Sequence, residues 1–199
     1  MPGPAVQDRE TDEALMLRYA AGDIAAFDTL YGRHALGAWR YLLRSVRDQA
    51  VADDLLQDVW FALVRQASSY QPTARFKTWL FTMAHHRMVD YFRTHKQHAS
   101  LDSAAGEGQE EAGPVLGDML AADSGFGPLR QLVSREQGAA LLAAVEQLPP
   151  VQREAFLLQA EGGMAVQEIA STTGVSFGTA KSRLRYARNF LRQRLEEWI

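Results

Sequence analysis

The sequence predicts an all-α protein in which two small helical domains are joined by a flexible acidic linker. Apolar residues recur at helical spacing through most of the 199-residue chain, and prolines or glycines separate these repeats. The stretch from Ser100 to Phe126 is instead rich in alanine, glycine, serine and acids without periodicity, which is typical of a linker. We therefore predict a disordered N-terminus over residues 1–11, a first domain over residues 12–98, a linker over residues 99–129 and a second domain over residues 130–199.

The second domain contains a predicted helix-turn-helix between Met164 and Arg194. Gly174 supplies the left-handed residue that ends a short first helix, and Ser176 caps the second helix. No acid occurs between Phe177 and Arg194, so the second helix favours a partner lined with phosphates. Its apolar face comprises Ala180, Leu184, Ala187 and Leu191, and its basic face comprises Lys181, Arg185, Arg188 and Arg192.

Two more helices are expected ahead of this motif. One runs from Glu136 to Gln147, and the two prolines that follow break it and begin the next helix, which continues to Glu161. The alternative for this domain is an ordinary bundle with a basic surface helix that binds no nucleic acid.

The first domain is expected to hold four helices. Asp12 is predicted to cap the first helix, and Asp23 to cap the second, whose inward face includes Tyr31. The third helix occupies residues 50–66, and the fourth runs from about Arg75 to Lys96 behind a proline-containing loop.

The third helix carries a polar and mostly acidic face. A helix N-terminus favours negative charge, which accounts adequately for Asp53 and Asp54. Asp58 lies too far along the helix for that explanation, so this face is a candidate for a protein partner.

The fourth helix interleaves aromatic residues with bases. This combination suits single-stranded nucleic acid, because rings stack on unpaired bases while cations hold the phosphates. The alternative is that Trp79, Phe81 and Phe92 simply belong to the core.

Composition and charge exclude several classes of protein. The chain has no cysteine, which excludes disulfides and thiolate metal sites, and no apolar run long enough to span a bilayer, so we expect a cytoplasmic protein. The net charge of −3 looks unfavourable for a nucleic-acid binder. The charges are segregated, however: bases dominate residues 65–98 and the last predicted helix, whereas residues 99–129 carry only acids.

The chain shows no sign of catalytic apparatus. His86 and Asp90 are spaced i, i+4, but no further ligand pattern accompanies them, and neither a glycine-rich phosphate loop nor an activated nucleophile is recognisable. We expect no catalytic residue, no metal and no cofactor. The rival hypothesis is a metal-dependent hydrolase built around His85, His86, Asp90 and His95.

Several of these segments together resemble a known family. They are DDLLQDVWFALVR, RFKTWLFTMAHHRMVDYFR, LPPVQREAFLLQAEGG and GVSFGTAKSRLRYAR. In order and spacing they resemble regions 2 and 4 of the extracytoplasmic-function (ECF) class of bacterial sigma-70 factors. The resemblance implies a non-enzymatic protein that binds core RNA polymerase and directs transcription initiation at promoters with specific −10 and −35 elements. A stand-alone helix-turn-helix regulator of transcription is the alternative.

The resemblance also implies partners and site residues. Core polymerase would contact the chain through the β′ clamp helices and the β flap, promoter DNA is the second partner, and an anti-sigma factor is a third candidate. The implied clamp-binding residues are Asp53, Asp54, Gln57 and Asp58. The implied −10 residues are Lys77, Trp79, His86, Arg87, Asp90 and Arg93, with a flipped base near Ser68 to Thr73. The implied −35 residues are Thr179, Lys181, Ser182, Arg183, Arg185, Tyr186 and Arg188.

Two departures from the family pattern affect these expectations. Ala165 stands where the family usually has a serine or threonine cap, which should cost that helix about 1 kcal/mol. His86 replaces a frequent asparagine, which alters the expected base preference in the −10 element and leads us to expect some pH sensitivity.

Overall fold

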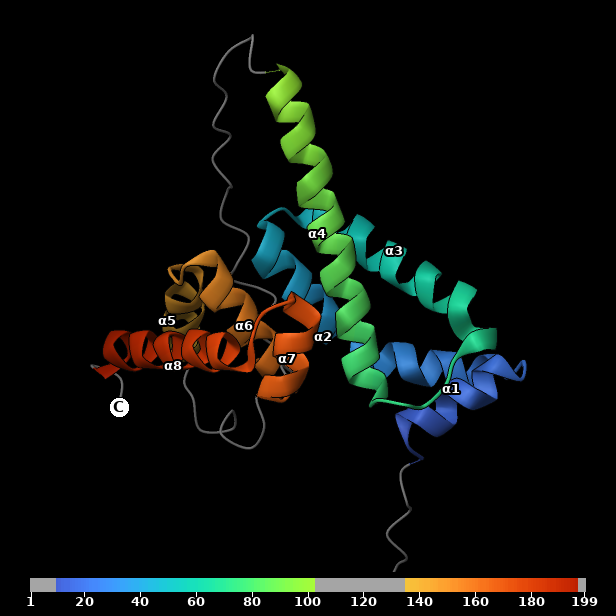
Figure 1. Ribbon diagram of the computed structural model, residues 1–199. Coiled ribbons are helices and arrows are strands. Elements are labelled where there is room, and N and C mark those ends of the chain that lie inside the picture. Colours follow the sequence, from blue (N-terminus) through green and yellow to red (C-terminus); the bar gives the residue numbers. More distant parts are fainter. Residues whose placement is uncertain (1–9, 103–134, 197–199) are drawn as a thin grey trace, which may run out of the picture.

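The computed structural model describes residues 10–102 and 135–196, and within these ranges it contains eight α-helices and one 3-10 helix (Figure 1). No strand occurs in the described ranges, and the predicted all-α class is confirmed. Most of the predicted disordered N-terminus and most of the predicted linker lie outside these residues. The helices are α1 Asp12–Ala20, α2 Ile24–Val46, α3 Gln49–Gln66, η1 Ala67–Ser69, α4 Phe76–Asp102, α5 Arg135–Glu146, α6 Pro150–Ala160, α7 Val166–Thr173 and α8 Phe177–Arg194.

Helix α1 begins one residue earlier than predicted. Thr11 is its N-cap, with the side-chain hydroxyl accepting from the Ala14 N–H at 3.2 Å. The predicted cap at Asp12 is therefore wrong. Its carboxylate instead accepts hydrogen bonds from Arg33 and His34 of α2. The predicted cap at Asp23 is confirmed, because its carboxylate accepts from the Ala25 N–H.

Helices α1 to α4 pack together, and we call this unit the N-terminal bundle. Leu30, Leu42 and Val59 are among its fully buried residues. Tyr31 was predicted to face inward but is exposed, since the side of α2 that carries it is covered only in part by α3. None of the helices in the described ranges combines the length and the apolar character that crossing a bilayer requires.

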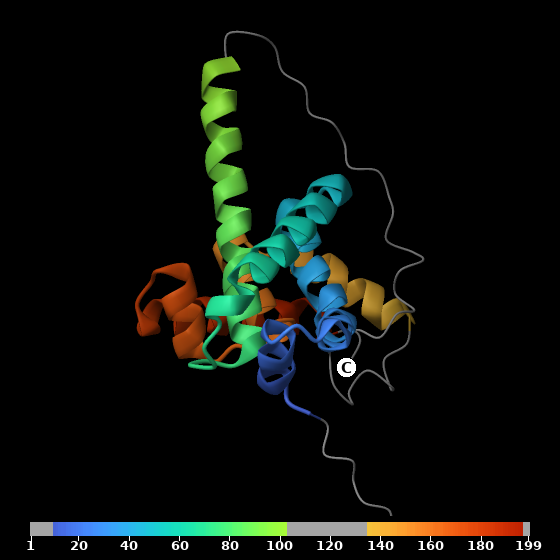
Figure 2. The same ribbon diagram turned by 90° about the vertical axis from the view of Figure 1, so that its right-hand side faces the viewer.

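Helix α4 is longer than predicted. It continues to Asp102, beyond the expected end near Lys96, and its second half projects from the body of the molecule (Figures 1 and 2). Since the first glycine after its start is Gly106 and no proline occurs before that point, nothing in the local sequence stops the helix at Lys96.

Helices α5 to α8 form a second unit, the C-terminal bundle. The predicted apolar face of α8 is confirmed, because each residue of that face is buried and α8 packs against α5, α6 and α7. These residues are Ala180, Leu184, Ala187 and Leu191.

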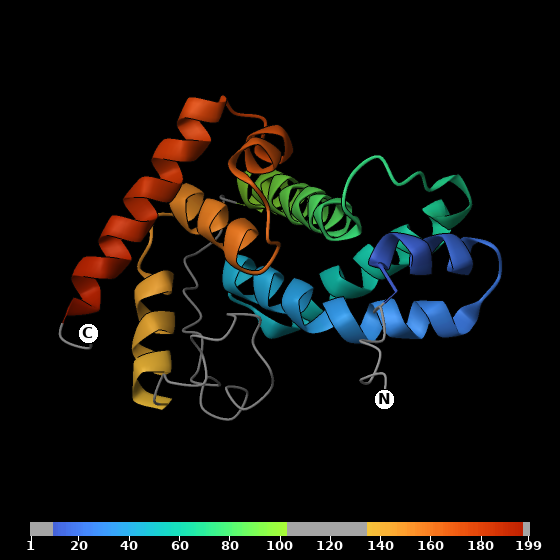
Figure 3. The ribbon, with the colours of Figure 1, turned by 90° about the horizontal axis from the view of Figure 1, so that it is seen from below.

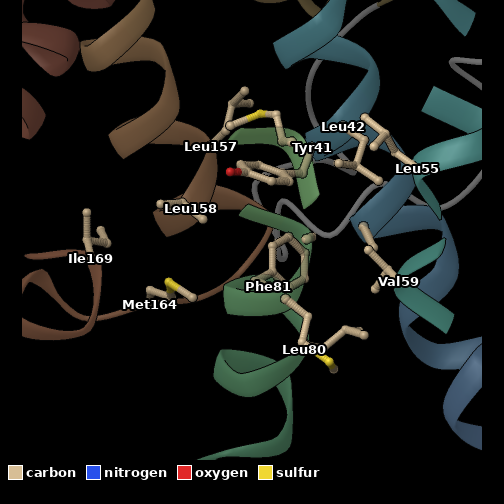
Figure 4. Close-up of a cluster of buried hydrophobic side chains, with 14 of the residues drawn as sticks. Tyr41, Leu42, Leu55, Val59, Leu80, Phe81, Leu157, Leu158, Met164 and Ile169 are labelled. Carbon is tan, nitrogen blue, oxygen red and sulfur yellow. The ribbon is translucent and has the colours of Figure 1, made fainter. Parts of the chain in front are cut away.

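The two bundles lie side by side rather than apart (Figure 3). Helix α6 packs against α2, and α7 packs against α4. Figure 4 shows Tyr41 and Phe81 of the N-terminal bundle next to Leu157, Leu158 and Met164 of the C-terminal bundle. All five side chains are fully buried, so the bundles share one apolar core.

Candidate nucleic-acid and protein interfaces

The helix-turn-helix has the turn geometry that its sequence predicts. Gly174 adopts φ 66° and ends α7, and the Ser176 hydroxyl accepts from the Thr179 N–H at 3.1 Å to begin α8. At the start of α7, Ala165 offers no side-chain acceptor. Only the Glu168 half of a capping box forms there, with its carboxylate accepting from the Ala165 N–H at 2.7 Å.

The exposed side of α8 carries the predicted −35 residues. Lys181, Arg185 and Tyr186 are exposed, and the Arg185 guanidinium lies 5.5 Å from the centre of the Tyr186 ring. Ser182 and Arg183 are half-buried at the margin of this side. Arg188 is exposed but donates to Gln159 of α6 at 2.6 Å, so it anchors α8 to the bundle.

Helix α3 presents the predicted acidic face to solvent. The residues Asp53, Asp54, Gln57 and Asp58 are all exposed. Among these four, within the described residues, only Asp53 makes a side-chain hydrogen bond: the Trp39 indole N–H donates to its carboxylate at 2.6 Å. That bond fixes the acidic face of α3 relative to α2.

An apolar groove of about 410 Å³ lies beside this acidic face. Phe61 and Val64 of α3 are exposed on one wall, and Tyr31 of α2 is exposed on the other. Trp60, which is only 5% exposed, also lines the groove. The full lining is Phe27, Tyr31, Asp53, Leu56, Gln57, Trp60, Phe61 and Val64.

Sequence reasoning missed the apolar part of this site. Phe61 follows Gln57 by four residues and Asp54 by seven, so all three share one face of α3. An exposed phenylalanine within a polar helical face was therefore visible in the sequence as a candidate contact.

A second hollow of about 230 Å³ lies where the loop after η1 meets α4. Tyr70 and Trp79 form one side of it, with ring centres 4.9 Å apart. Its remaining lining is polar and comprises Gln66, Ser69, Gln71 and Thr73. The hollow lies within the segment in which a flipped base was expected.

The predicted −10 residues of α4 do not all share one face. His86, Asp90 and Arg93 are exposed on the same side of the helix, where Arg93 pairs with Asp90 at 3.0 Å. Arg87 is half-buried beside them. Lys77 points instead toward Phe81 and the C-terminal bundle, 5.9 Å from the ring centre, and burial lowers the pKa of its ammonium group against the opposing attraction of Glu161.

The histidines proposed for a metal site do not converge. His85 faces Glu154 of α6, with 2.9 Å between Nδ1 and the nearer carboxylate oxygen but without the alignment of a hydrogen bond. His95 Nδ1 instead lies 3.1 Å from the carbonyl oxygen of Tyr91. In residues 10–102 and 135–196, no three histidines or acids are grouped as ligands for one metal ion.

Comparison with known proteins assigns the chain to a family. Residues 30–98 match the sigma-70 region 2 family, and residues 138–191 match the sigma-70 region 4 family. The RNA polymerase sigma factor CarQ of Myxococcus xanthus is 34% identical over 182 residues, covering 92% of this chain and 96% of that protein. The ECF RNA polymerase sigma factor SigL of Mycobacterium tuberculosis is 30% identical over 185 residues, covering 89% and 93%. The chain belongs to the ECF class of sigma factors.

Solved structures share the fold of this ECF sigma factor. The sigma factor RpoE, in complex with the anti-sigma factor NepR from Bartonella quintana, superposes with a TM-score of 0.62 at 20% identity, covering 85% of this chain and 96% of that one. CnrH, in complex with the cytosolic domain of CnrY, gives 0.60 at 22% identity, covering 94% and 99%. The region 2 match lies in the N-terminal bundle and its α4 extension, and the region 4 match lies in the C-terminal bundle.

Proposed function

We propose that this ECF sigma factor divides promoter-specific initiation among three surfaces. The α3 face binds core RNA polymerase, the loop and α4 hold the unpaired −10 strand, and α8 reads the −35 element. The observation that carries this proposal is the placement of an acidic-apolar face, an aromatic hollow and an acid-free basic helix on three separate elements. The domain limits at residues 12–98 and 130–199 belong to the same proposal.

The α3 face suits docking on the polymerase clamp helices. An apolar groove with Phe61 exposed at its wall can bury a partner's side chains, and the neighbouring acids supply charge that selects a basic partner. Asp54 and Asp58 are free to meet cations across such an interface, whereas Asp53 is oriented by Trp39. The β flap is the proposed second contact on polymerase.

The hollow at Tyr70 and Trp79 suits an unpaired base. Both rings can offer apolar contact, and the polar lining can donate to or accept from the base edges. Stacking contributes about 1–3 kcal/mol per base, which is comparable with the roughly 0.6–2.2 kcal/mol of each duplex step that opens. Strand opening is thus driven by binding, and the protein performs no turnover chemistry of its own.

Helix α8 suits the major groove of duplex DNA. Arg185 and Lys181 reach base edges or phosphates from the exposed side of α8. Arg183 and Arg188 are assigned to the sugar-phosphate backbone of the DNA. The proposed regulatory partner of the protein is an anti-sigma factor. The protein's proposed location is the cytoplasm.

Two variants separate polymerase binding from DNA reading. Arg185→Ala should weaken −35 recognition by about 1–3 kcal/mol and leave polymerase affinity unchanged. Asp54→Lys combined with Asp58→Lys should reverse the pattern, because it inverts the charge of the docking face. Polymerase affinity is measured with purified core enzyme, and promoter recognition by run-off transcription over pooled genomic promoters.

The two proposals for α3 and α8 would be wrong if both variants lost DNA and neither lost polymerase. Binding of duplex DNA by a wild-type chain that has no affinity for core polymerase would instead favour the stand-alone regulator.

A further inference from the structure

The first turn of α8 differs in chemistry from the rest of the helix. It consists of Phe177, Gly178, Thr179 and Ala180, and none of these side chains carries a charge or an amide group. The first cation of α8 is Lys181, one turn into the helix. The N-terminal end of α8 is therefore mostly apolar, whereas its basic side begins one turn later.

Phe177 is exposed to solvent although its side chain is a large apolar ring. It is the first residue of α8 after the Ser176 cap, and 50% of its surface is accessible. Phe190, the other phenylalanine of α8, instead packs against the buried cluster of the molecule. Since a ring stabilises a fold mainly through the surface that it buries, packing within the C-terminal bundle does not account for a phenylalanine at position 177.

The other side chains of this turn have little capacity to read a base by hydrogen bonds. The Thr179 N–H donates to the Ser176 hydroxyl at 3.1 Å, and the hydroxyl groups of these two residues lie 2.9 Å apart, so the Thr179 hydroxyl takes part in the cap. Gly178 and Ala180 have no polar side-chain group, and Ala180 is buried. Neither Arg nor Asn nor Gln, the side chains that bond a base edge through two atoms, occurs in this turn.

The position of Phe177 is one that meets DNA in a helix-turn-helix. In that motif the second helix lies in the major groove, and its N-terminal residues contact the base edges. Helix α8 runs along the outer edge of the C-terminal bundle (Figure 3). Because residues four apart share a side of a helix, Phe177 lies in one row with Lys181 and Arg185, which are both exposed.

One base offers an apolar group in the major groove. Thymine carries a C5-methyl group there, and phenylalanine is among the side chains that contact it, whereas the other bases present hydrogen-bonding atoms that a phenyl ring cannot pair. An exposed ring at the reading end of α8 thus matches a T·A base pair better than any other pair.

We propose that Phe177 is a specificity-determining residue that reads one thymine of the −35 element through its C5-methyl group. This inference rests on the proposed function of α8 and deepens it, because it assigns a base to one position of the element. The cations that follow in the same row, Lys181 and Arg185, contact phosphates and polar base edges. Phe177 adds an apolar contact at one end of the element.

Selection from a randomised −35 element tests the proposal. Core polymerase carrying the full chain is bound to duplexes of one promoter, found by run-off transcription, in which the −35 segment is randomised. The wild type should enrich a T·A pair, in one orientation, at one position near an end of the element. Phe177→Ala should weaken that preference by at least about fivefold and keep the preferences at the other positions. Phe177→Leu, which remains apolar, should keep part of it.

Deoxyuridine in place of the selected thymine tests the methyl contact directly, because it removes the methyl group and leaves the base pairing unchanged. The wild-type holoenzyme should bind the deoxyuridine duplex about fourfold more weakly than the thymine duplex. Phe177→Ala should bind the two duplexes equally. Val151→Ala, which changes a 46% exposed apolar residue of α6, is the matched control and should discriminate between the duplexes as the wild type does.

Each outcome of these two experiments decides the proposal. It is overturned if Phe177→Ala retains every base preference of the wild type, or if the deoxyuridine duplex binds the wild type as tightly as the thymine duplex. An equal loss of affinity for all sequences would also overturn it, and would place Phe177 on the DNA backbone or on polymerase. Should Phe177→Ala fail to fold, the Phe177→Leu variant and the wild-type response to deoxyuridine still decide.

Failure of the proposed function would look different. A wild-type holoenzyme that enriches no −35 sequence would contradict the assignment of α8 to the −35 element. That result is distinguishable from failure of the present inference, because it is seen with the unsubstituted chain and at every position of the element.

Discussion

The Asp12 carboxylate links α1 to α2 and does not cap α1. It accepts from Arg33 at 2.6 Å and lies 2.7 Å from the His34 ring nitrogen, which joins α1 to α2. Burial by itself would raise the pKa of Asp12, but the hydrogen bonds and charges of His34 and Arg33 outweigh it and lower the pKa overall. The contribution to stability is therefore present above the usual carboxyl pKa and is lost as the pH falls through the lowered value.

Asp12→Asn should lower the free energy of unfolding at neutral pH by about 1–3 kcal/mol, since it removes a charged acceptor from two donors. The difference from wild type should shrink as the pH falls below the usual carboxyl range. Denaturant unfolding at several pH values measures this, with the exposed Asp28→Asn in α2 as the control. A difference that stays constant down to strongly acidic pH would contradict the assigned role.

Ala165 leaves the first turn of α7 with an unused position for a cap. Its backbone, at φ −71° and ψ 160°, is already in the extended conformation of an N-cap residue. Ala165→Ser should complete the capping box with Glu168 and raise the free energy of unfolding by about 1 kcal/mol. Thermal or denaturant unfolding measures the gain, and Ala139→Ser, at an exposed position inside α5, should give none.

At the scale of the element, adjacent residues of α3 serve different purposes: Phe61 is placed to bind a partner, and Trp60 stabilises the fold. Phe61 is 52% exposed at the wall of the groove, whereas the adjacent Trp60 is 5% exposed and contacts the Phe27 and Tyr31 rings. Neighbouring positions on this helix therefore have different consequences when they are truncated.

Phe61→Ala should weaken core polymerase binding by about 1–3 kcal/mol with little change in the free energy of unfolding, because the ring is half outside the fold. Trp60→Ala should lower the free energy of unfolding by about 3–5 kcal/mol. Polymerase titration and denaturant unfolding on both variants measure the contrast. Equal loss of stability in the two would place Phe61 in the core instead.

Helix α4 serves two sides of the molecule. Trp79, His86 and Arg93 face the solvent side proposed for DNA, whereas Thr78 and His85 face the C-terminal bundle. The helical period places these two sets on different faces of α4. The partners of Thr78 and His85 lie on α7 and α6, and the sequence of α4 alone could not predict them.

At the scale of the whole molecule, charge segregation reconciles a net charge of −3 with a polyanionic ligand. The affinity for promoter DNA should fall with salt at a logarithmic slope of about −0.9 for each phosphate neutralised. Lys181→Ala should reduce the size of that slope by about one if Lys181 contacts a phosphate. Titrations of holoenzyme on promoter DNA at several salt concentrations measure it, and an unchanged slope would place Lys181 off the backbone.

The limits of prediction differ between the site and the fold. The sides of α8 and the acidic face of α3 follow from local spacing and were predicted residue by residue. The groove at Phe61 and the orientation of Lys77 were not, because each depends on which neighbour a helix packs against. The end of α4 was also missed, since the composition after Lys96 resembles a linker although it contains no helix breaker before Gly106.

The sequence by itself determined the helices, most of their caps, the helix-turn-helix and, through its resemblance, the ECF class. These features depend on the spacing of nearby residues and on motifs that can be recognised in one sequence. Only the tertiary structure decided that the two bundles share a core and that Arg44 of one bundle meets Glu161 of the other. The physical reason is distance along the chain: Arg44 and Glu161 are 117 residues apart, and no local pattern specifies which buried cation a buried carboxylate will meet.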